Sequence, residues 1–303
     1  MAYPGFYAAE RVGELYTPQS SQAIQVGRSA GCAPAQQDRQ RIILLLVDMQ
    51  VDFVHPEGAL SVPGAVEDTR RTIEFIYRYA CKITSIAASL DSHLPLQIFS
   101  PSWWTDEKGE HPPPYTVISA EEVSAGHWRP LYEIDWSKRY VQQLEAQSRK
   151  QLMIWPYHTL IGTPGHNLMP ALYEAIAFHA SARQTQPIFL QKGDEPLTEH
   201  YSILEPEVKV PRKAILNTDF LSVLASYDLI YIAGQAKSHC VLESVSSMMN
   251  YFSKDIVARI RVLDDAMSSV AHPTIDFEAL SEQAFARYSA QGLTRRKTTD
   301  PLG

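Results

Sequence analysis

Side chains that could act as acids, bases or nucleophiles follow short apolar runs at four separate points of the chain. They are Asp48, Asp91 with His93, Lys192, and Cys240, which comes six residues after Gly234. A carboxylate can shuttle protons, an ammonium group can stabilise a neighbouring anion, and a thiolate is a strong nucleophile. In an open parallel sheet, ligands bind beyond the carboxyl ends of the strands. We therefore expect these side chains to meet at one edge of a sheet.

Three of these residues could form a hydrolytic set. Cys240 is expected at the start of a helix, where free N–H groups and the helix dipole favour the thiolate. Lys192 would hold that thiolate by charge pairing, and Asp48 would take the thiol proton and return one to a leaving amine. Taken singly, each has a simpler explanation: a buried structural cysteine, a solvated strand end and a loop acid. Their combination after separate strands favours catalysis.

His239 is a poor base for Cys240, because adjacent residues of a helix point about 100° apart. Asp91 and His93 lie at i and i+2, on one side of an extended segment, and His158 is a third candidate ligand. Two histidines and one aspartate suit a divalent metal, most simply Zn²⁺, with Fe²⁺ or Mn²⁺ as alternatives, and leave positions open for water or substrate.

The elements that must position these side chains alternate between strand and helix. Apolar runs predict strands at 42–47, 83–90, 187–191, 229–233 and 260–263, and an edge strand at 293–298. Helical periodicity predicts helices at 64–80, 168–183, 219–226, 241–252 and 277–291. Such alternation predicts right-handed βαβ units, and hence a three-layer α/β/α fold with an open, mostly parallel sheet of about six strands.

Two segments interrupt this pattern. Residues 1–40 have no sustained period and are interpreted as an N-terminal extension, a tail or an arm wrapped on a neighbour. Residues 41–303 then form a single domain, with an insertion at about 100–153 that contains Trp103, Trp104 and a predicted helix at 136–150. An insertion of this length usually serves as a lid, an oligomer contact or both.

The composition excludes several classes of function. The 303 residues carry a net charge of −7, which argues against a nucleic-acid-coating surface, and the longest apolar run is too short to span a bilayer. The three cysteines, Cys32, Cys81 and Cys240, cannot all pair, so the sequence argues against a disulfide framework and favours a reducing cytoplasm. Cys32 and Cys81 are interpreted as structural thiols.

Motifs around the reactive residues resemble the isochorismatase-like cysteine hydrolases, and among them the nicotinamidases. Asp48-Met-Gln50-Val-Asp52-Phe53 is similar to the opening signature of that family, Lys192-Gly193 to its strand-end lysine, and Gly234-Gln-Ala-x-x-x-Cys240-Val to its nucleophile loop. Trp155-Pro-x-His158 is the segment most typical of nicotinamidases. The resemblance covers roughly residues 41–100 and 153–292.

This resemblance implies a role for each matching residue. Asp48, Lys192 and Cys240 would be the catalytic triad, and the N–H groups of Ala236 and Cys240 would form the oxyanion hole after a cis Gln235–Ala236 peptide bond. The resemblance assigns the metal to Asp91, His93 and His158, and the aromatic pair around the substrate ring to Phe53 and Trp155. Two positions depart from the pattern: Ser92 replaces a tryptophan, and Gln97-Ile98-Phe99 stands where a second histidine falls, which leaves three ligands.

The resulting expectation is a cysteine-dependent amidohydrolase that converts nicotinamide to nicotinate and ammonia through a thioester. Its partner would be a small-molecule amide, without nucleic acid or membrane, and the resemblance implies a homo-oligomer. Three alternatives remain open: the same triad acting on another small amide or N-carbamoyl compound with the metal site vacant, a metallohydrolase whose metal-bound water attacks, and a non-catalytic binding protein on this fold.

Overall fold

The apolar run at 42–47 forms the central strand of the main sheet in the computed structural model, which describes residues 3–148, 150–211, 213 and 215–303. Every residue of this strand, β1 (Ile42–Val47), is buried, as expected where helices cover both faces of a parallel sheet. The other strands are β2 (Ser85–Asp91), β7 (Ile188–Lys192), β8 (Leu229–Gly234), β9 (Ile260–Leu263) and β10 (Thr294–Arg296). The sequence predicted each of their boundaries to within two residues.

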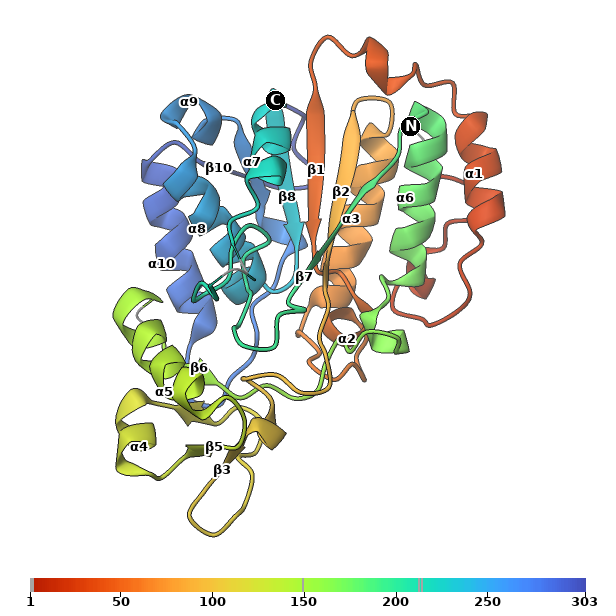
Figure 1. Ribbon diagram of the computed structural model, residues 1–303. Helices are drawn as coiled ribbons and strands as arrows, with labels where there is room; N and C mark the ends of the chain where they lie inside the picture. Colours follow the sequence, from red (N-terminus) through yellow and green to blue (C-terminus); the bar gives the residue numbers. More distant parts are fainter. Residues whose placement is uncertain (1–2, 149, 212, 214) are drawn as a thin grey trace.

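The six strands are parallel and lie in the order β10-β9-β8-β1-β2-β7 (Figure 1). The chain therefore runs outward from β1 to one edge, returns to the centre, and continues from β8 to the other edge. The reversal lies between β1 and β8, where Val47 is in register with Gly234. In open α/β sheets, this switch point is where ligands bind, beyond the carboxyl ends of the strands.

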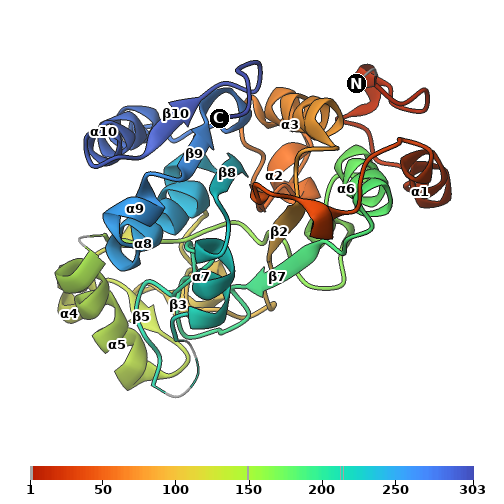
Figure 2. The ribbon, with the colours of Figure 1, turned by 90° about the horizontal axis from the view of Figure 1, so that it is seen from above.

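Helices cover both faces of the sheet, which confirms the predicted three-layer α/β/α fold (Figure 2). One face packs against α3 (Ala65–Tyr79) and α6 (Pro170–Arg183). The other packs against α7 (Thr218–Ala225), α8 (Leu242–Tyr251) and α10 (Phe277–Ala290), while α2 (Val51–Val54) and α9 (Lys254–Val257) are single turns. None of the helices described is long and apolar enough to cross a membrane.

The insertion lies at the carboxyl end of the sheet, where the arrowheads of the strands point in Figure 1. Its elements are β3 (Trp104–Thr105), β4 (Val117–Ile118), α4 (Ala120–Ala125), β5 (Arg129–Pro130), α5 (Ile134–Gln143) and β6 (Leu152–Met153). The helix predicted at 136–150 corresponds to α5, which continues from Leu144 to Ser148 as a π-helical turn. Trp103 and Trp104 are buried and form part of the core, and the Trp103 indole N–H donates to Ser137 Oγ at 2.9 Å.

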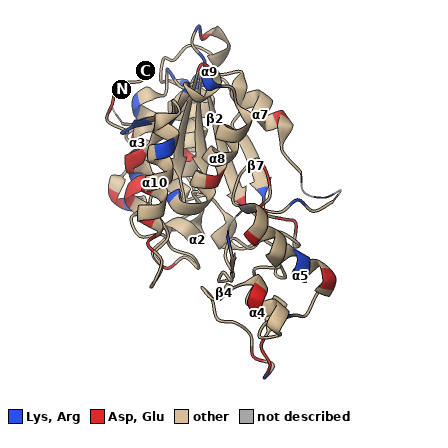
Figure 3. Ribbon diagram, turned by 90° about the vertical axis from the view of Figure 1, so that its left-hand side faces the viewer, with Lys and Arg blue, Asp and Glu red and all other residues tan. Residues whose placement is uncertain are grey.

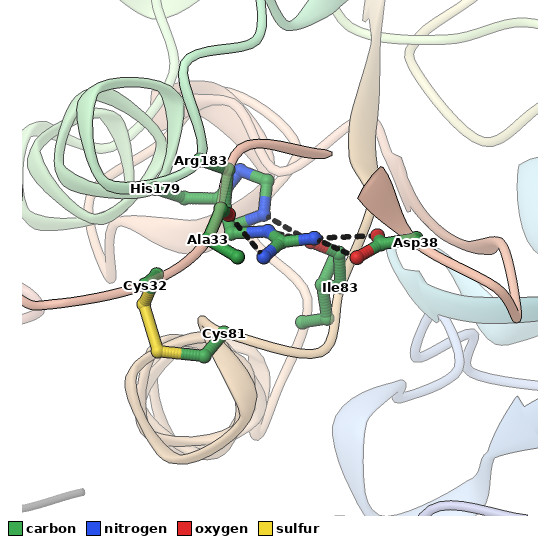
Figure 4. Close-up of a disulfide and its surroundings, with 7 residues drawn as sticks. All are labelled: Cys32, Ala33, Asp38, Cys81, Ile83, His179 and Arg183. Atoms are coloured by element: carbon green, nitrogen blue, oxygen red, sulfur yellow. Dashed lines mark hydrogen bonds and ion pairs between the residues drawn. A yellow bond between two sulfur atoms is a disulfide. The ribbon is translucent and has the colours of Figure 1, made fainter. Parts of the chain in front are cut away.

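The N-terminal extension packs on its own domain. Its helix α1 (Ser20–Arg28) lies against α6, and the carboxylate of Glu174 on α6 accepts hydrogen bonds from the Tyr16 hydroxyl at 3.0 Å and the Gln19 N–H at 2.7 Å. Arg183 at the end of α6 is buried and forms an ion pair with Asp38 (Figure 4). The extension therefore forms an additional layer outside α6.

The prediction that Cys32 and Cys81 are free thiols is wrong, because the two residues form a disulfide (Figure 4). Cys32 belongs to the extension and Cys81 follows α3, so the pair is brought together only when the extension folds back onto the domain. Cys240 is the free cysteine. Disulfides persist mainly in oxidising compartments, so the cysteines no longer support the expected cytoplasmic location.

Removing this disulfide is expected to destabilise the protein by about 2–4 kcal/mol, because the bond closes a long loop of the unfolded chain. Its cysteines are 49 residues apart. The measurement is the urea midpoint of the wild type with and without reductant, with the Cys32→Ser/Cys81→Ser variant as the already reduced reference. Equal midpoints for all three samples would show that the bond contributes nothing.

Candidate active site

The carboxyl ends of four strands bring the predicted reactive side chains together. Asp48 follows β1, Asp91 ends β2, Lys192 ends β7, and Cys240 lies on the turn between β8 and α8. All four side chains are buried, and the carboxylates of Asp48 and Asp91 lie within 4.8 Å of each other and of the Cys240 sulfur. The site therefore forms at the switch point between β8 and β1 and at β2 and β7, the two strands on the β1 side of it.

The Lys192 ammonium lies at the centre of this group. Its Nζ is 2.9 Å from Asp48 Oδ2, 2.8 Å from Asp91 Oδ1 and 3.5 Å from Cys240 Sγ, and it donates to the carbonyl oxygen of His200 at 3.0 Å. Burial alone would lower the pKa of Lys192, but the two carboxylates and the Cys240 sulfur outweigh burial and raise it well above its usual value. Lys192 is therefore a fixed positive charge between the nucleophile and two acids.

Asp48 has the environment of a proton acceptor. Burial raises its pKa, the neighbouring Asp91 adds to that rise, and Lys192 opposes it. The Ser89 hydroxyl donates to Asp48 Oδ1 at 2.6 Å, which fixes the carboxylate in place. Gly234 has a φ of 130°, and a Cβ at that position would collide with the backbone of Val47, so only glycine allows β8 to lie this close to the end of β1, just before Asp48.

Cys240 lies on a π-helical turn, Lys237–Val241, which follows a cis peptide bond between Gln235 and Ala236. The cis bond confirms one expectation from the sequence. Burial raises the pKa of Cys240 well above its usual value, and the positive charge of Lys192 only partly offsets that rise, so burial opposes the thiolate-favouring effect expected at the start of a helix. The carboxylate of Asp48, the group expected to remove the thiol proton, lies within 4.8 Å of the Cys240 sulfur.

Asp91, His93 and His158 converge on one point. Asp91 Oδ2 is 2.8 Å from His93 Nε2 and 3.7 Å from His158 Nε2. The Nδ1 atoms face backbone carbonyls instead, that of His93 at Gly193 (3.0 Å) and that of His158 at Pro156 (2.7 Å). Both Nε2 atoms therefore face the carboxylate, and carbonyls that orient the rings in this way are typical of metal-binding histidines. The residues present fit a divalent metal.

Gly193 allows this metal group to assemble beside Lys192. Its φ is 83°, and a Cβ there would lie 2.7 Å from Asp91 Oδ1 and 2.8 Å from His93 Cε1. Gln97, which stands near the position of a second family histidine, is not a ligand, because its amide N–H donates to the Gly193 carbonyl at 2.7 Å. Gln97 therefore holds the same carbonyl that orients His93.

The two predicted aromatic residues lie on different flanks of the site. Phe53 is buried against the metal group, with its ring 5.4 Å from that of His158. Trp155 is buried beside the nucleophile turn, 5.3 Å from the ring of His239, and its indole N–H donates to the Tyr201 hydroxyl at 3.0 Å. The rings of Phe53 and Trp155 are thus associated with the metal group and the nucleophile, respectively.

Comparison of the fold with solved structures finds nicotinamidases, although the sequence matches no family model and no curated protein. The yeast nicotinamidase bound to the inhibitor nicotinaldehyde has a TM-score of 0.58 at 16% identity, over 84% of this chain and 99% of the yeast chain. The Acinetobacter baumanii nicotinamidase and pyrazinamidase has a TM-score of 0.56 at 19% identity, over 88% of this chain and 100% of its own. This chain has the isochorismatase-like fold of the nicotinamidases. The Pyrococcus horikoshii pyrazinamidase in complex with zinc also matches, with a TM-score of 0.50 at 19% identity, over 85% and 99% of the two chains.

Within this isochorismatase-like fold, two residues of the Asp48–Phe53 segment hold other residues in place, a role that the sequence did not reveal. The Gln50 amide donates to the Asp91 carbonyl at 2.8 Å and accepts from the Asp91 N–H at 2.7 Å. Asp52 Oδ2 accepts from the Thr159 N–H at 2.6 Å and thereby holds the residue next to His158. Two polar residues of one short segment therefore fix two of the three candidate metal ligands.

Sequence reasoning also missed Glu199, which follows β7 and is buried near the metal group of this isochorismatase-like fold. Burial raises the pKa of Glu199 to about 8, while the charge of His93 opposes that rise. Glu199 Oε2 is buried and has no hydrogen-bond partner among the residues described. A buried glutamate inside a loop carries no sequence signal, because its burial depends on how that loop folds.

Proposed function

We propose that this protein is a cysteine-dependent amidohydrolase that cleaves a small carboxamide, with nicotinamide as the first substrate to test. The observation that carries the proposal is the buried Lys192 ammonium, which contacts the Asp48 carboxylate and lies 3.5 Å from the Cys240 sulfur. A nucleophile, a proton acceptor and a fixed charge in mutual contact are the groups that acyl transfer requires.

The reaction begins with proton transfer from the Cys240 thiol to Asp48. The sulfur then attacks the amide carbon, and the N–H groups of Ala236 and Cys240 stabilise the oxyanion, as backbone donors do in other acyl-transfer enzymes. Asp48 returns the proton to the leaving nitrogen, and ammonia departs from a thioester on Cys240. Asp48 in its basic form next takes a proton from water, and the hydroxide attacks the thioester carbon. The carbon–sulfur bond breaks, the acid is released, and Asp48 returns the proton to the Cys240 sulfur.

Lys192 keeps Asp48 oriented and stabilises negative charge as the thiolate forms. Asp91, His93 and His158 would hold a divalent metal, and that metal would supply an open coordination position for the ring nitrogen of the substrate. Phe53 and Trp155 are the candidate walls for the ring. Zinc is the metal we propose, with iron or manganese as alternatives for this donor set.

The test is ammonia release from nicotinamide by the purified wild type. The proposal predicts one nicotinate for each ammonia released. Absence of release from a folded, metal-loaded protein would exclude nicotinamide as a substrate and leave other small amides and N-carbamoyl compounds to be tested with the same assay.

Replacing His158 with alanine is expected to weaken zinc binding by about 10-fold or more, because it removes one of three protein ligands. The measurement is zinc content by elemental analysis after dialysis against a graded chelator series. His179→Ala is the matched control, since His179 is equally buried but bonds to the Ile83 carbonyl at the other end of the sheet. Equal zinc retention by the wild type and the His158 variant would remove His158 from the ligand set.

A further inference from the structure

A cavity of about 350 Å³ lies beside the nucleophile turn and has no part in the mechanism above. Ser238 and His239, which immediately precede Cys240, line one side of it. The insertion contributes Leu144 and Leu152, and α10 contributes Phe277 and Leu280. A cavity of this size with mainly apolar walls is typical of a small-molecule site.

The cavity and the candidate active site share a wall. Tyr201 lines the cavity, and its hydroxyl accepts the hydrogen bond from Trp155 Nε1 at 3.0 Å. His239 also lines the cavity, and its ring lies 5.3 Å from both Trp155 and Tyr201. The rings of Tyr201 and His239 therefore stand between Trp155 and the cavity, and an arm on a substrate held at Cys240 would enter the cavity by turning these two rings aside.

One polar group in the wall lacks a protein partner. Glu199 lines the cavity and is only 4% exposed, and its Oε2 atom has no hydrogen-bond partner in the described part of the chain. Its backbone is held, because the Glu199 N–H donates to the Tyr140 hydroxyl at 3.0 Å. A buried carboxyl oxygen without a partner is unfavourable unless a bound molecule or water satisfies it.

The surrounding charges limit what the cavity can bind. Acidic residues lie on α4, α5 and α10 (Figure 3), and Glu199 and Glu243 lie in the cavity wall itself, so the cavity disfavours an anion. The Lys150 ammonium also lines the cavity, but it is paired with Glu243 at 2.7 Å and with Glu207 at 2.8 Å, so these charges are satisfied within the protein. A neutral group is therefore the best match.

We propose that this cavity binds a neutral apolar arm of the amide substrate, an aromatic or branched alkyl group that carries a hydrogen-bonding group for Glu199. The inference rests on the proposed amidohydrolase function and narrows its substrates to amides larger than a single ring. The insertion then contributes to specificity, since it supplies part of the wall of the arm site and none of the catalytic groups.

The test compares propanamide with 3-phenylpropanamide and 3-(4-hydroxyphenyl)propanamide, which differ only in the arm. For wild type, we expect kcat/KM to rise about 10-fold or more when the ring is added, because the ring is removed from water. Leu152→Trp, which fills the cavity, is expected to abolish that gain. Leu131→Trp is the matched control, because Leu131 is an exposed residue of the insertion that does not line the cavity.

Leu280→Trp gives the same test if Leu152→Trp fails to fold, because Leu280 lines the cavity but is 53% exposed and tolerates a larger side chain. Equal kcat/KM for all three amides, or a gain that survives both variants, would overturn the arm site while leaving the proposed function intact.

A protein that hydrolyses neither nicotinamide nor any of these amides would contradict the proposed function instead. Calorimetric titration of 3-phenylpropanamide then tests separately whether the cavity binds the phenyl arm. Binding that Leu152→Trp or Leu280→Trp weakens 10-fold supports the arm site, and absence of binding to wild type overturns it.

Discussion

Replacing Cys240 with alanine is expected to lower the rate of amide hydrolysis by about ten-thousandfold or more, because the reaction loses its nucleophile. Asp48 and Lys192 would remain, but neither can form the thioester. Stability should change little, since a buried thiol replaced by a methyl group leaves only a small cavity. The measurement is ammonia release at saturating substrate, with the thermal midpoint and zinc content of the same preparation.

The chain provides a matched control for this prediction. Cys32 and Cys81 lie at the amino end of the sheet, opposite the candidate site, so the Cys32→Ala/Cys81→Ala variant should lose stability and keep its specific activity. Substantial activity in Cys240→Ala would instead support attack by metal-bound water, which is the main mechanistic alternative.

Lys192→Met has the second largest expected effect, and it acts on both stability and activity. The variant would leave the buried carboxylates of Asp48 and Asp91 without the ammonium that now lies 2.9 Å and 2.8 Å from them. Removing one partner of a buried ion pair typically lowers the free energy of unfolding by about 3–5 kcal/mol. We also expect kcat to fall by about a hundredfold or more, because the thiolate loses its neighbouring positive charge.

Urea unfolding and ammonia release measure the two effects separately. Lys82→Met, at an exposed lysine near the amino end of β2, should change neither. If the loss of stability comes from uncompensated charge, the double variant Lys192→Met/Asp48→Asn should recover part of it while remaining inactive. A Lys192→Met variant as stable and active as wild type would show that Lys192 supports neither the fold nor the reaction.

Most of the fold could be predicted because its signals are local. The apolar run 42–47 allows only a buried strand, and the alternation of such runs with helical patterns determines a parallel sheet. The positions of Asp48, Asp91, Lys192 and Cys240 follow from the same pattern, since residues after parallel strands share one edge. Lys192 contacts Asp48 and Asp91 and lies 3.5 Å from the Cys240 sulfur, so these side chains do lie together at that edge, while their roles stay a prediction.

What could not be predicted depends on contacts between distant segments. Cys32 pairs with Cys81 only because the extension folds back, and no local pattern marks that path. The raised pKa of Cys240 comes mainly from its burial, which depends on the packing of distant segments and is not visible in the sequence around Cys240. The cavity beside His239 forms where the insertion meets α10, so neither segment alone predicts it.

The most direct test of the account is whether an acyl group forms on Cys240 during turnover. Wild type is mixed with nicotinamide, quenched in acid at intervals during ammonia release, and digested for peptide mass analysis. The account predicts a fraction of the Cys240 peptide that carries one nicotinoyl group, which disappears once the substrate is exhausted. An unmodified Cys240 peptide at every interval, during verified ammonia release, would contradict the thioester and with it the role assigned to Cys240.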